Sequence, residues 1–316
     1  MRKTALVTGA EGFIGSCLVR FLLAKGWSVT GSYLVRPDPL PRLPNLQWIE
    51  CDLHEQRAVR ALMRKTTPTH IFHLGAQSLP VVSREDPVGT FESNIMGSLH
   101  LFEAVRHARL APRIIAACSS AEYGEVPASA LPTRETQCLR PLHPYGISKV
   151  CLDLLARQYW LDYKIPALSL RIFNTTGPGK TNDAPSDFVR QLVRIRRGQQ
   201  PPVLEAGNLK SRRAFLDVDD TVRGFYAAAL KGRPGEAYNL CGPVAYRIGD
   251  VLQMAIRLSR VRPQVKQARR LMHPHDEKII FGDSTKICRD TGWRPHKSLE
   301  QTLTSMLEYW DSALPA

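Results

Sequence analysis

Tyr145 and Lys149 lie four residues apart, and the serine-rich segment Cys118 to Gly124 precedes them. In a helix, a spacing of four residues puts both side chains on one face. A phenol has an ordinary pKa of about 10, and a neighbouring ammonium lowers that pKa by favouring the phenolate. The pair therefore predicts an acid–base site. The alternative is an ordinary half-buried tyrosine beside a surface lysine.

A second motif, Thr8-Gly9-Ala10-Glu11-Gly12-Phe13-Ile14-Gly15, lies between a short apolar run and an apolar helical pattern. The backbone N–H groups and the dipole at a helix N-terminus can hold a diphosphate, and glycines permit the tight turn that this needs. The Gly-x-x-Gly-x-x-Gly spacing differs from the commoner dinucleotide fingerprint, but its position between strand and helix suits the same mechanism. We predict a dinucleotide site here; the alternative is an ordinary strand–helix turn.

The end of the second predicted strand has no carboxylate of its own. It reads Gly31-Ser32-Tyr33-Leu34-Val35-Arg36, whereas an acidic residue at this point holds the adenosine ribose of NAD. A guanidinium tolerates a 2′-phosphate, so the segment predicts NADP(H) in preference to NAD(H), unless Arg36 is a solvated loop residue. Asp52, after the third predicted strand, is expected either to accept a hydrogen bond from adenine or to form a capping box with Glu55.

The elements that carry these motifs alternate between strand and helix. Apolar runs predict strands at residues 5–7, 27–30, 46–49, 71–74, 114–117 and 167–172. This order predicts an α/β fold, a Rossmann-like doubly wound parallel sheet. Pro- and Gly-rich stretches follow, with helices near 186–197, 217–231 and 299–311, and indicate a smaller, partly interleaved α/β substrate domain. We assign 1–172 and 215–241 to the dinucleotide-binding domain, and 173–214 and 242–316 to the substrate domain.

Composition narrows the class of protein. The 316 residues include 43 Lys plus Arg, 29 Asp plus Glu and 43% hydrophobic residues, and no apolar run approaches the ~20 residues of a membrane span. Gly9 and Glu11 interrupt the start before it resembles a signal peptide, so we expect a cytoplasmic protein without membrane partners. The net charge of +14 favours anionic partners, but the dispersed basic residues argue against nucleic acid.

No metal site is predicted. The seven cysteines form no Cys-x-x-Cys pair, so we expect reduced thiols. The run His273-Pro274-His275-Asp276-Glu277 lacks helical ligand spacing and contains a proline, which favours a loop.

At these motifs the sequence resembles the extended short-chain dehydrogenase/reductase family (NAD-dependent epimerase/dehydratase) over essentially its whole length. The glycine turn, the segment ending in Tyr123-Gly124, and Tyr145 with Lys149 after His143-Pro144 carry this resemblance. Further segments are most similar to the GDP-mannose 4,6-dehydratase and GDP-4-keto-6-deoxymannose reductase branch. These segments are Leu74-Gly75-Ala76-Gln77-Ser78, Phe173-Asn174-Thr175-x-Gly177-Pro178-Gly179, Arg213-Ala214-Phe215-x-Asp217-Val218 and Thr291-Gly292-Trp293-Arg294-Pro295.

The resemblance implies roles for single residues. Tyr145 would be the general acid–base, Lys149 would lower its pKa and hold the nicotinamide ribose, and Ser119 would hydrogen-bond the reacting sugar oxygen. The residues expected at the cofactor are Gly9, Gly12, Phe13, Ile14, Gly15, Arg36, Asp52, Leu53, Leu74, Gly75, Ala76, Gln77, Tyr145 and Lys149. The residues expected at a nucleotide-sugar substrate, which the second domain would bind, are Ser78, Ser120, Asn174, Phe188, Val189, Arg213 and Glu277.

The resemblance leaves the reaction open between reduction and dehydration. A 4,6-dehydratase needs a further acid–base group, and the branch dehydratases place a glutamate two residues before the Tyr-Gly pair. Here that residue is Ala121, and Glu122 lies one residue later, where an extended segment would turn it to the other face unless the loop is kinked. We therefore favour an NADP(H)-dependent reductase of the C4 ketone of a GDP-linked 4-keto-6-deoxyhexose. A GDP-mannose 4,6-dehydratase with Glu122 as its acid–base residue and a nucleotide-sugar epimerase are the alternatives.

Two further expectations concern partners. A non-catalytic dinucleotide sensor is an alternative of a different class, although such sensors generally lack the catalytic tyrosine. The family usually forms homodimers through two helices per subunit, which are expected here near 88–109 and 143–162.

Overall fold

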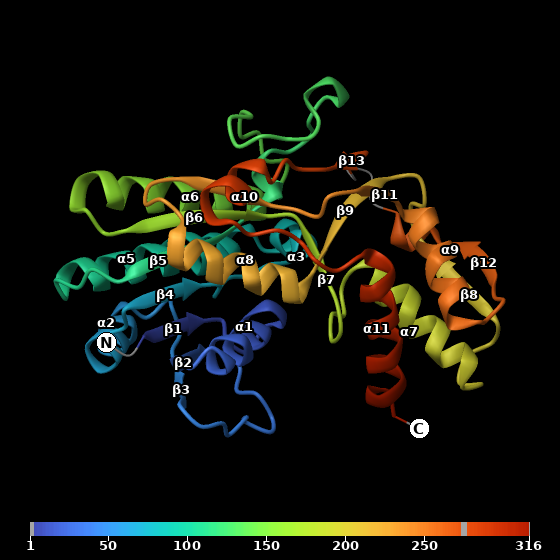
Figure 1. Ribbon diagram of the computed structural model, residues 1–316, viewed down its shortest axis with the longest axis horizontal. Coiled ribbons are helices and arrows are strands. Elements are labelled where there is room, and N and C mark those ends of the chain that lie inside the picture. The colour runs from blue at the N-terminus through green and yellow to red at the C-terminus, as the bar shows by residue number, and fades with distance from the viewer. Residues whose placement is uncertain (1–2, 273–276, 316) are drawn as a thin grey trace.

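A computed structural model describes residues 3–272 and 277–315 (Figure 1). Its main sheet has seven parallel strands in the order β10-β6-β5-β4-β1-β2-β3. The strands are β1 (Thr4–Thr8), β2 (Ser28–Tyr33), β3 (Leu46–Glu50), β4 (His70–His73), β5 (Arg113–Ser119), β6 (Ala167–Ile172) and β10 (Ala237–Leu240). The chain reverses direction across the sheet between β1 and β4, and in such sheets ligands bind outside the carboxyl ends of the strands at this point.

Helices cover both faces of the sheet, as near-continuous apolar strands require. One core lies under α1 (Phe13–Ala24), α8 (Val218–Lys231) and α10 (Thr285–Thr291). The opposite core lies under α2 (Gln56–Thr66), α5 (Gly97–His107) and α6 (Pro144–Tyr163). The predicted Rossmann-like α/β fold is therefore confirmed.

Three short helices connect β4 to α5: α3 (Pro80–Glu85), α4 (Pro87–Phe91) and the π-helix η1 (Glu92–Met96). Two 3-10 turns, η2 (Ser120–Glu122) and η3 (Ala128–Ala130), lie between β5 and α6. This green segment projects at the top of Figure 1, where Thr133 bridges to Gly282 just after β13.

The remaining elements form the other half of the molecule (Figure 1). They are β7 (Asn174–Thr176), β9 (Arg212–Asp217), β11 (Ala245–Arg247), β13 (Ile279–Ile280), the pair β8 (Val203–Ala206) and β12 (Gln264–Gln267), α7 (Ala184–Arg196), α9 (Ile248–Ser259), the 3-10 turn η4 (Arg269–Leu271) and α11 (Leu299–Ala313). A separate core joins α7, α9 and α11. The helices α7, α8 and α11 match those predicted near 186–197, 217–231 and 299–311, while the exact domain boundaries stay a prediction.

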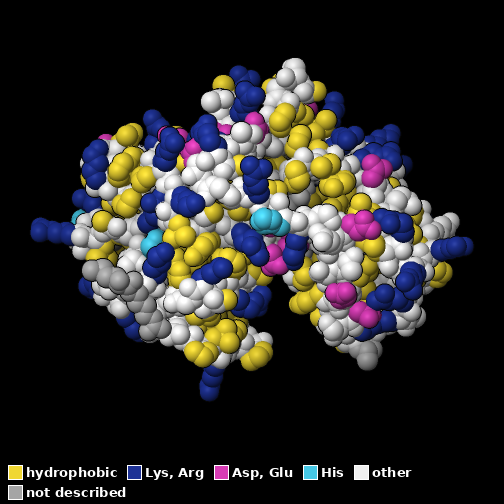
Figure 2. Space-filling model, viewed as in Figure 1, with side chains coloured by type: hydrophobic (Ala, Val, Ile, Leu, Met, Phe, Trp, Pro, Cys, Tyr) yellow, Lys and Arg dark blue, Asp and Glu magenta, His cyan; other side chains and the backbone are white. Residues whose placement is uncertain are grey.

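The surface is notched between the two halves, and basic side chains are spread over the visible face (Figure 2). Among the described residues, no helix has both the length and the apolar character needed to cross a membrane.

Candidate active site

The glycine turn lies between β1 and α1, at the reversal point of the sheet. Gly9 has a φ of +63°, and a Cβ there would lie 2.8 Å from the Cα of Gly75; a Cβ on Gly15 would lie 2.1 Å from the Gly9 carbonyl oxygen. Only glycine suits both positions, so the turn seats α1 against the ends of β1 and β4. Gly12 caps α1, whose first turn carries no acidic residue. The free N–H groups of this turn can therefore hold a diphosphate.

A buried hydrogen-bond network lies behind this turn. The Thr8 hydroxyl accepts from the backbone N–H groups of Leu74 (3.1 Å) and Gly75 (3.0 Å), which joins the ends of β1 and β4. It also bonds His73 Nδ1 at 2.8 Å, and His73 Nε2 bonds the Ser98 hydroxyl at 2.9 Å. Burial lowers the pKa of His73 to about 3, so the ring is neutral.

Asn94, in the π-helix η1, extends this network to the helix of Tyr145. The hydroxyl of Ser98 donates to the Asn94 carbonyl oxygen. The Asn94 side chain pairs with the backbone N–H (2.7 Å) and carbonyl (2.9 Å) of Gln77 and donates to the Ser148 hydroxyl at 2.9 Å. Ser148 in turn donates to the Tyr145 carbonyl at 2.7 Å. Asn94 is a positioning residue that the sequence analysis missed, because no local pattern marks a π-helical turn.

The end of β2 receives a carboxylate from the glycine turn. Leu34 N–H donates to Glu11 Oε1 at 3.0 Å, while Glu11 Oε2 is buried without a hydrogen-bond partner among the described residues. Leu34, Val35 and Arg36 are exposed. A carboxylate therefore lies at the end of β2 after all, and it is supplied by Glu11 of the glycine turn and not by the strand.

Asp52 is not a helix cap. Its Oδ1 accepts from His54 N–H at 2.9 Å, whereas the N-cap of α2 is Glu55, whose side chain makes no capping hydrogen bond. The alternative of a capping box is wrong, because α2 begins three residues later than that motif requires. Leu53 packs beside Gly75, where a Cβ would lie 2.9 Å from Leu53 Cδ1. Adenine contacts by Asp52 and Leu53 stay predictions.

Ser119, Tyr145 and Lys149 meet at the carboxyl end of β5. Ser119 ends this strand, and Tyr145 and Lys149 occupy the first two turns of α6, which His143 caps by accepting from Gly146 N–H at 3.1 Å. The Ser119 side chain lies close enough to the Tyr145 phenol to lower its pKa. Lys149 Nζ lies 5.8 Å from the centre of the Tyr145 ring. The structure therefore brings the three predicted catalytic side chains together.

The predicted acidification of Tyr145 is not found. Burial raises the pKa of the Tyr145 phenol to about 12, against the lowering effect of the Ser119 side chain. Lys149 Nζ donates to the carbonyl oxygen of Ala117 at 2.8 Å, and burial lowers the pKa of its ammonium. The physical reason is that desolvation of the phenol disfavours the phenolate more than its neighbours favour it. The Tyr145 phenol is thus protonated at neutral pH.

Glu122 turns away from the candidate site. The segment after β5 kinks into η2, but the kink buries Glu122 completely. Its Oε1 accepts from Ser119 N–H at 2.8 Å, and its Oε2 lies 3.3 Å from Arg171 Nε, which also donates to Asp153 Oδ2 at 3.1 Å. Burial, then repulsion from Asp153, raises the pKa of Glu122 to about 8. The hypothesis that Glu122 is a catalytic residue is therefore corrected: it is a positioning residue for Ser119.

The residues expected at the nucleotide end lie on adjoining strands. Asn174 lies on β7, and its side chain donates to Ala214 O at 3.4 Å; Arg213 lies on the neighbouring β9 and donates to Glu277 O at 2.7 Å. The side chains of Asn174 and Glu277 are half-buried, whereas Arg213 is buried. Their contact with a diphosphate or ribose stays a prediction.

Two predicted substrate residues belong to the core instead. Phe188 and Val189 are buried on α7 and pack among the apolar side chains of α9 and α11. Their side chains are unavailable to a substrate, because the apolar face of α7 is turned inward. Ser78 is exposed and Ser120 half-buried, so both remain candidates.

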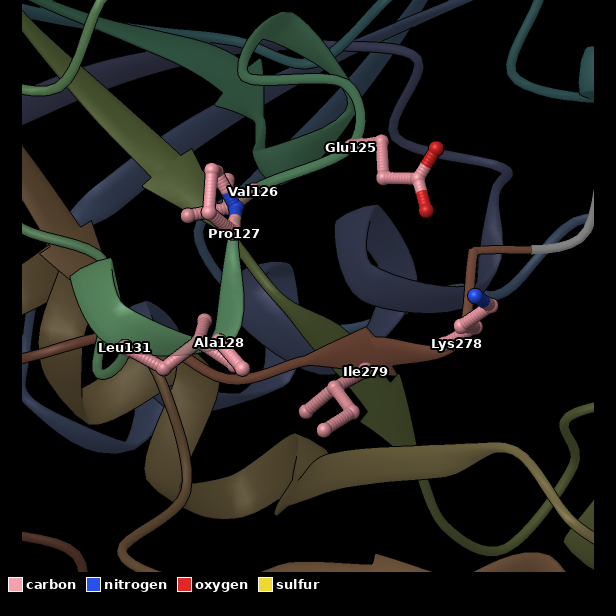
Figure 3. Close-up of a pocket in the computed structure, with 7 residues that line it drawn as sticks. All are labelled: Glu125, Val126, Pro127, Ala128, Leu131, Lys278 and Ile279. Carbon is pink, nitrogen blue, oxygen red and sulfur yellow. The ribbon is translucent and has the colours of Figure 1, made fainter.

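A cavity of about 450 Å³ lies beside the projecting segment (Figure 3). In Figure 3 the charged ends of Glu125 and Lys278 lie on one side of it and Leu131 on the other, with Ile279 at its floor. None of the predicted site residues lines it, although Lys278 directly follows Glu277. It is therefore not the catalytic centre.

Lys180 is a second residue missed from the sequence. Its ammonium lies 5.1 Å from the centre of the Phe13 ring, at the first residue of α1. Burial lowers the pKa of Lys180, while Asp183 opposes this effect. The loop before α7 thus brings a cation to the N-terminus of α1, beside the glycine turn, a contact across more than half of the chain that no local motif indicates.

The described residues provide no cluster suited to a metal ion. No group of three His, Cys, Asp or Glu side chains is positioned for one within 3–272 and 277–315, and all seven cysteines are free. Of the run that begins at His273, only Glu277 is described; residues 273–276 lie outside the described part of the chain.

Comparisons with known proteins agree with this geometry. A family model described as GDP-mannose 4,6 dehydratase matches residues 6–306. GDP-6-deoxy-D-mannose reductase of Pseudomonas aeruginosa is 27% identical over 99% of this chain and 98% of its own length. GDP-mannose 4,6-dehydratase of Vibrio cholerae is 26% identical over 97% of this chain and 93% of its own.

Two solved structures extend the likeness to three dimensions. RMD from Pseudomonas aeruginosa complexed with NADPH superposes with a TM-score of 0.86, 26% identity and coverage of 99% of this chain and 100% of that one. The UDP-glucose 4-epimerase of Thermus thermophilus in complex with NAD gives a TM-score of 0.87, 27% identity and coverage of 98% and 100%. The names of these relatives span reduction, dehydration and epimerisation.

Proposed function

Because the chain belongs to the GDP-mannose 4,6-dehydratase family, we propose that it reduces the C4 ketone of a GDP-linked 4-keto-6-deoxyhexose. Family members are NAD(P)-dependent nucleotide-sugar reductases, dehydratases and epimerases of the extended short-chain dehydrogenase/reductase type, and this chain is an enzyme of that type. The choice of reaction among them is the proposal.

The residues present fit a dinucleotide. The glycine turn presents the N-terminus of α1, and Glu11 keeps a buried carboxylate oxygen without a partner among the described residues beside it. A nicotinamide bound here supplies the hydride. Lys149 is proposed to hold the ribose of that nicotinamide, which requires its ammonium to share or leave the carbonyl of Ala117.

Tyr145 and Ser119 act on the sugar ketone in this proposal. Tyr145 donates its phenolic proton to the C4 oxygen as the hydride reaches C4, and the phenolate that remains is reprotonated from solvent before the next turnover. The pKa of about 12 suits a donor that must be protonated at neutral pH. The Ser119 hydroxyl, beside the phenol, polarises the same oxygen.

The choice of a reductase rests on the position of Glu122. Dehydration needs an acid–base group at the sugar in addition to Tyr145, and loss of such a group typically costs roughly 10²-fold in rate. Ala121 has no such group, and the carboxyl group of Glu122 faces Ser119 N–H and Arg171 in the interior.

Two parallel reactions test this proposal. We expect the purified enzyme to oxidise NADH or NADPH when given a GDP-4-keto-6-deoxyhexose, and to form no 4-keto sugar from GDP-mannose. The variant Tyr145→Phe is the control for turnover at this site. A 4-keto product from GDP-mannose would reject the reductase in favour of the dehydratase. Epimerisation without net change in nicotinamide absorbance would favour the epimerase, and cofactor binding without any turnover would favour the sensor.

The NADP(H) preference expected from the sequence does not carry over into this proposal. That expectation depended on the lack of a carboxylate at the end of β2, and Glu11 provides one. The similarity to a structure complexed with NADPH supports a nicotinamide dinucleotide, and the similarity to another with NAD leaves the preference open.

We also propose a homodimer that pairs α6 and the α4–α5 segment with their copies. Three apolar side chains at seven-residue spacing are exposed on α6: Ile147 (42%), Leu154 (55%) and Leu161 (50%). Val88 (65%) and Met96 (43%) are exposed on the neighbouring segment. Apolar residues at this spacing form a continuous stripe along a helix, which suits packing against a second copy.

A further inference from the structure

Two hydrogen bonds hold Glu11 and its neighbour Ala10 against the end of β2. The preceding residue, Ala10, donates its N–H to Ser32 O at 3.0 Å, and its Cβ would lie 2.9 Å from a Cβ placed on Gly31. Leu34 N–H then donates to Glu11 Oε1 at 3.0 Å. These contacts leave the turn little freedom to move relative to β2, so the carboxylate is held at the first residue beyond the strand.

The second oxygen of this carboxylate has no partner in the described part of the chain. Glu11 Oε2 is buried and makes no hydrogen bond within residues 3–272 and 277–315. A buried carboxylate oxygen costs free energy unless it accepts hydrogen bonds, which is the usual state of such groups in proteins. An unpaired one next to a phosphate cradle therefore points to a ligand with hydroxyl donors.

The position of the Glu11 carboxylate at the end of β2 indicates which part of a dinucleotide it would bind. In dinucleotide-binding sheets, the group at the end of the second strand meets the adenosine ribose: a carboxylate accepts from the 2′- and 3′-hydroxyls, whereas a 2′-phosphate meets a cation. The segment between β2 and β3 offers two cations, Arg36 and Arg42, both exposed and neither in an ion pair within the described residues.

We propose that Glu11 is the residue that selects the dinucleotide: its carboxylate binds the adenosine ribose hydroxyls and makes the chain favour NAD(H) over NADP(H). The inference rests on the proposed function only for the presence of a nicotinamide dinucleotide. A 2′-phosphate would replace a hydroxyl donor with two negative charges beside a carboxylate, which is unfavourable in a partly buried site.

Binding titrations of NADH and NADPH test this assignment without sugar turnover. The proteins are the wild type, Glu11→Gln and Glu55→Gln, each followed by nicotinamide fluorescence or calorimetry. Gln keeps an oxygen that accepts from Leu34 N–H but removes the charge. Glu55, the exposed N-cap of α2, is the matched control, because its substitution removes the same charge away from β2.

We expect the wild type to bind NADH roughly tenfold or more tightly than NADPH, since one charge-assisted hydrogen bond corresponds to at least that factor. Glu11→Gln should weaken NADH binding and strengthen NADPH binding, so that the ratio falls about tenfold; Glu55→Gln should leave the ratio unchanged. A wild type that prefers NADPH, or equal shifts in both variants, would overturn the inference. Binding of neither dinucleotide would overturn the cofactor site and the proposed function with it.

Discussion

The buried Glu122 should make the stability of this protein fall as the pH rises through the neutral range. Its pKa is raised from 4.5 to about 8 in the folded chain, because its carboxyl group is buried and faces Asp153 as well as Arg171. Between these values the unfolded chain has released the proton while the folded chain still holds it. Stability from this group is therefore complete at low pH and is lost as the pH rises toward 8.

The variant Glu122→Gln isolates this contribution, because an amide cannot titrate. Each pH unit of the interval corresponds to about 1.4 kcal/mol, so between about pH 5.5 and about pH 7.5 the variant should become more stable relative to the wild type by about 3 kcal/mol. The amide beside Arg171 adds an offset that does not vary with pH. The slope, and not the offset, is the predicted quantity.

Urea unfolding followed by circular dichroism at several pH values measures this slope. The control is Glu125→Gln, which removes an exposed carboxylate three residues away and should give no such slope relative to the wild type. A difference between Glu122→Gln and the wild type that stays constant with pH would refute the reasoning. It would mean that Arg171 keeps Glu122 ionised despite its burial.

Three further predictions concern the site and the assembly. Tyr145→Phe should lower kcat for reduction at least about 10²-fold; equal activity would remove Tyr145 as the proton donor. Because the pKa of Tyr145 is raised to about 12, kcat for reduction should not decline between about pH 7 and about pH 9, and a decline with a midpoint in that interval would contradict a protonated phenol. Leu154→Asp should convert the dimer to a monomer in sedimentation velocity, whereas Leu43→Asp, also exposed but distant in the chain, should not; a wild type that sediments as a monomer would end the dimer proposal.

The fold was predictable from the sequence because its signals are local. Parallel strands that are buried on both faces appear in the sequence as short apolar runs. A strand followed by the glycines at Gly9 to Gly15 and then by a helix is compatible with few folds. The prediction that Tyr145 and Lys149 lie on one face likewise required only that a single helix contains both residues. Even the inward orientation of Glu122 followed from its one-residue offset, although the kink at η2, rather than an extended segment, produces it.

What the sequence did not indicate depends on contacts between distant segments. In the sequence Glu11 is only an unspecified position of the glycine motif and an interruption of an apolar start. Its role requires knowing that β2 lies next to β1. Phe188 and Val189 were assigned to a substrate from motif position alone, but both lie on the apolar face of α7 and are buried in the core. The pKa of Tyr145 was misjudged because the spacing indicates a neighbouring ammonium but not the burial of the phenol, which raises its pKa most.

The network behind the glycine turn has a fixed polarity. Thr8 already accepts two backbone N–H groups, so its own hydrogen points to His73 Nδ1, and the neutral ring must then carry its hydrogen on Nε2 and give it to Ser98. Ser98 passes its hydrogen to the carbonyl of Asn94. Every donor in this relay is oriented the same way, from the glycine turn toward the helix that carries Tyr145, and only one tautomer of the imidazole permits it. A second proton on the His73 ring would place an N–H donor opposite the hydroxyl hydrogen of Thr8. The network is therefore incompatible with a charged His73 and with hydrogen bonds that run in the opposite direction.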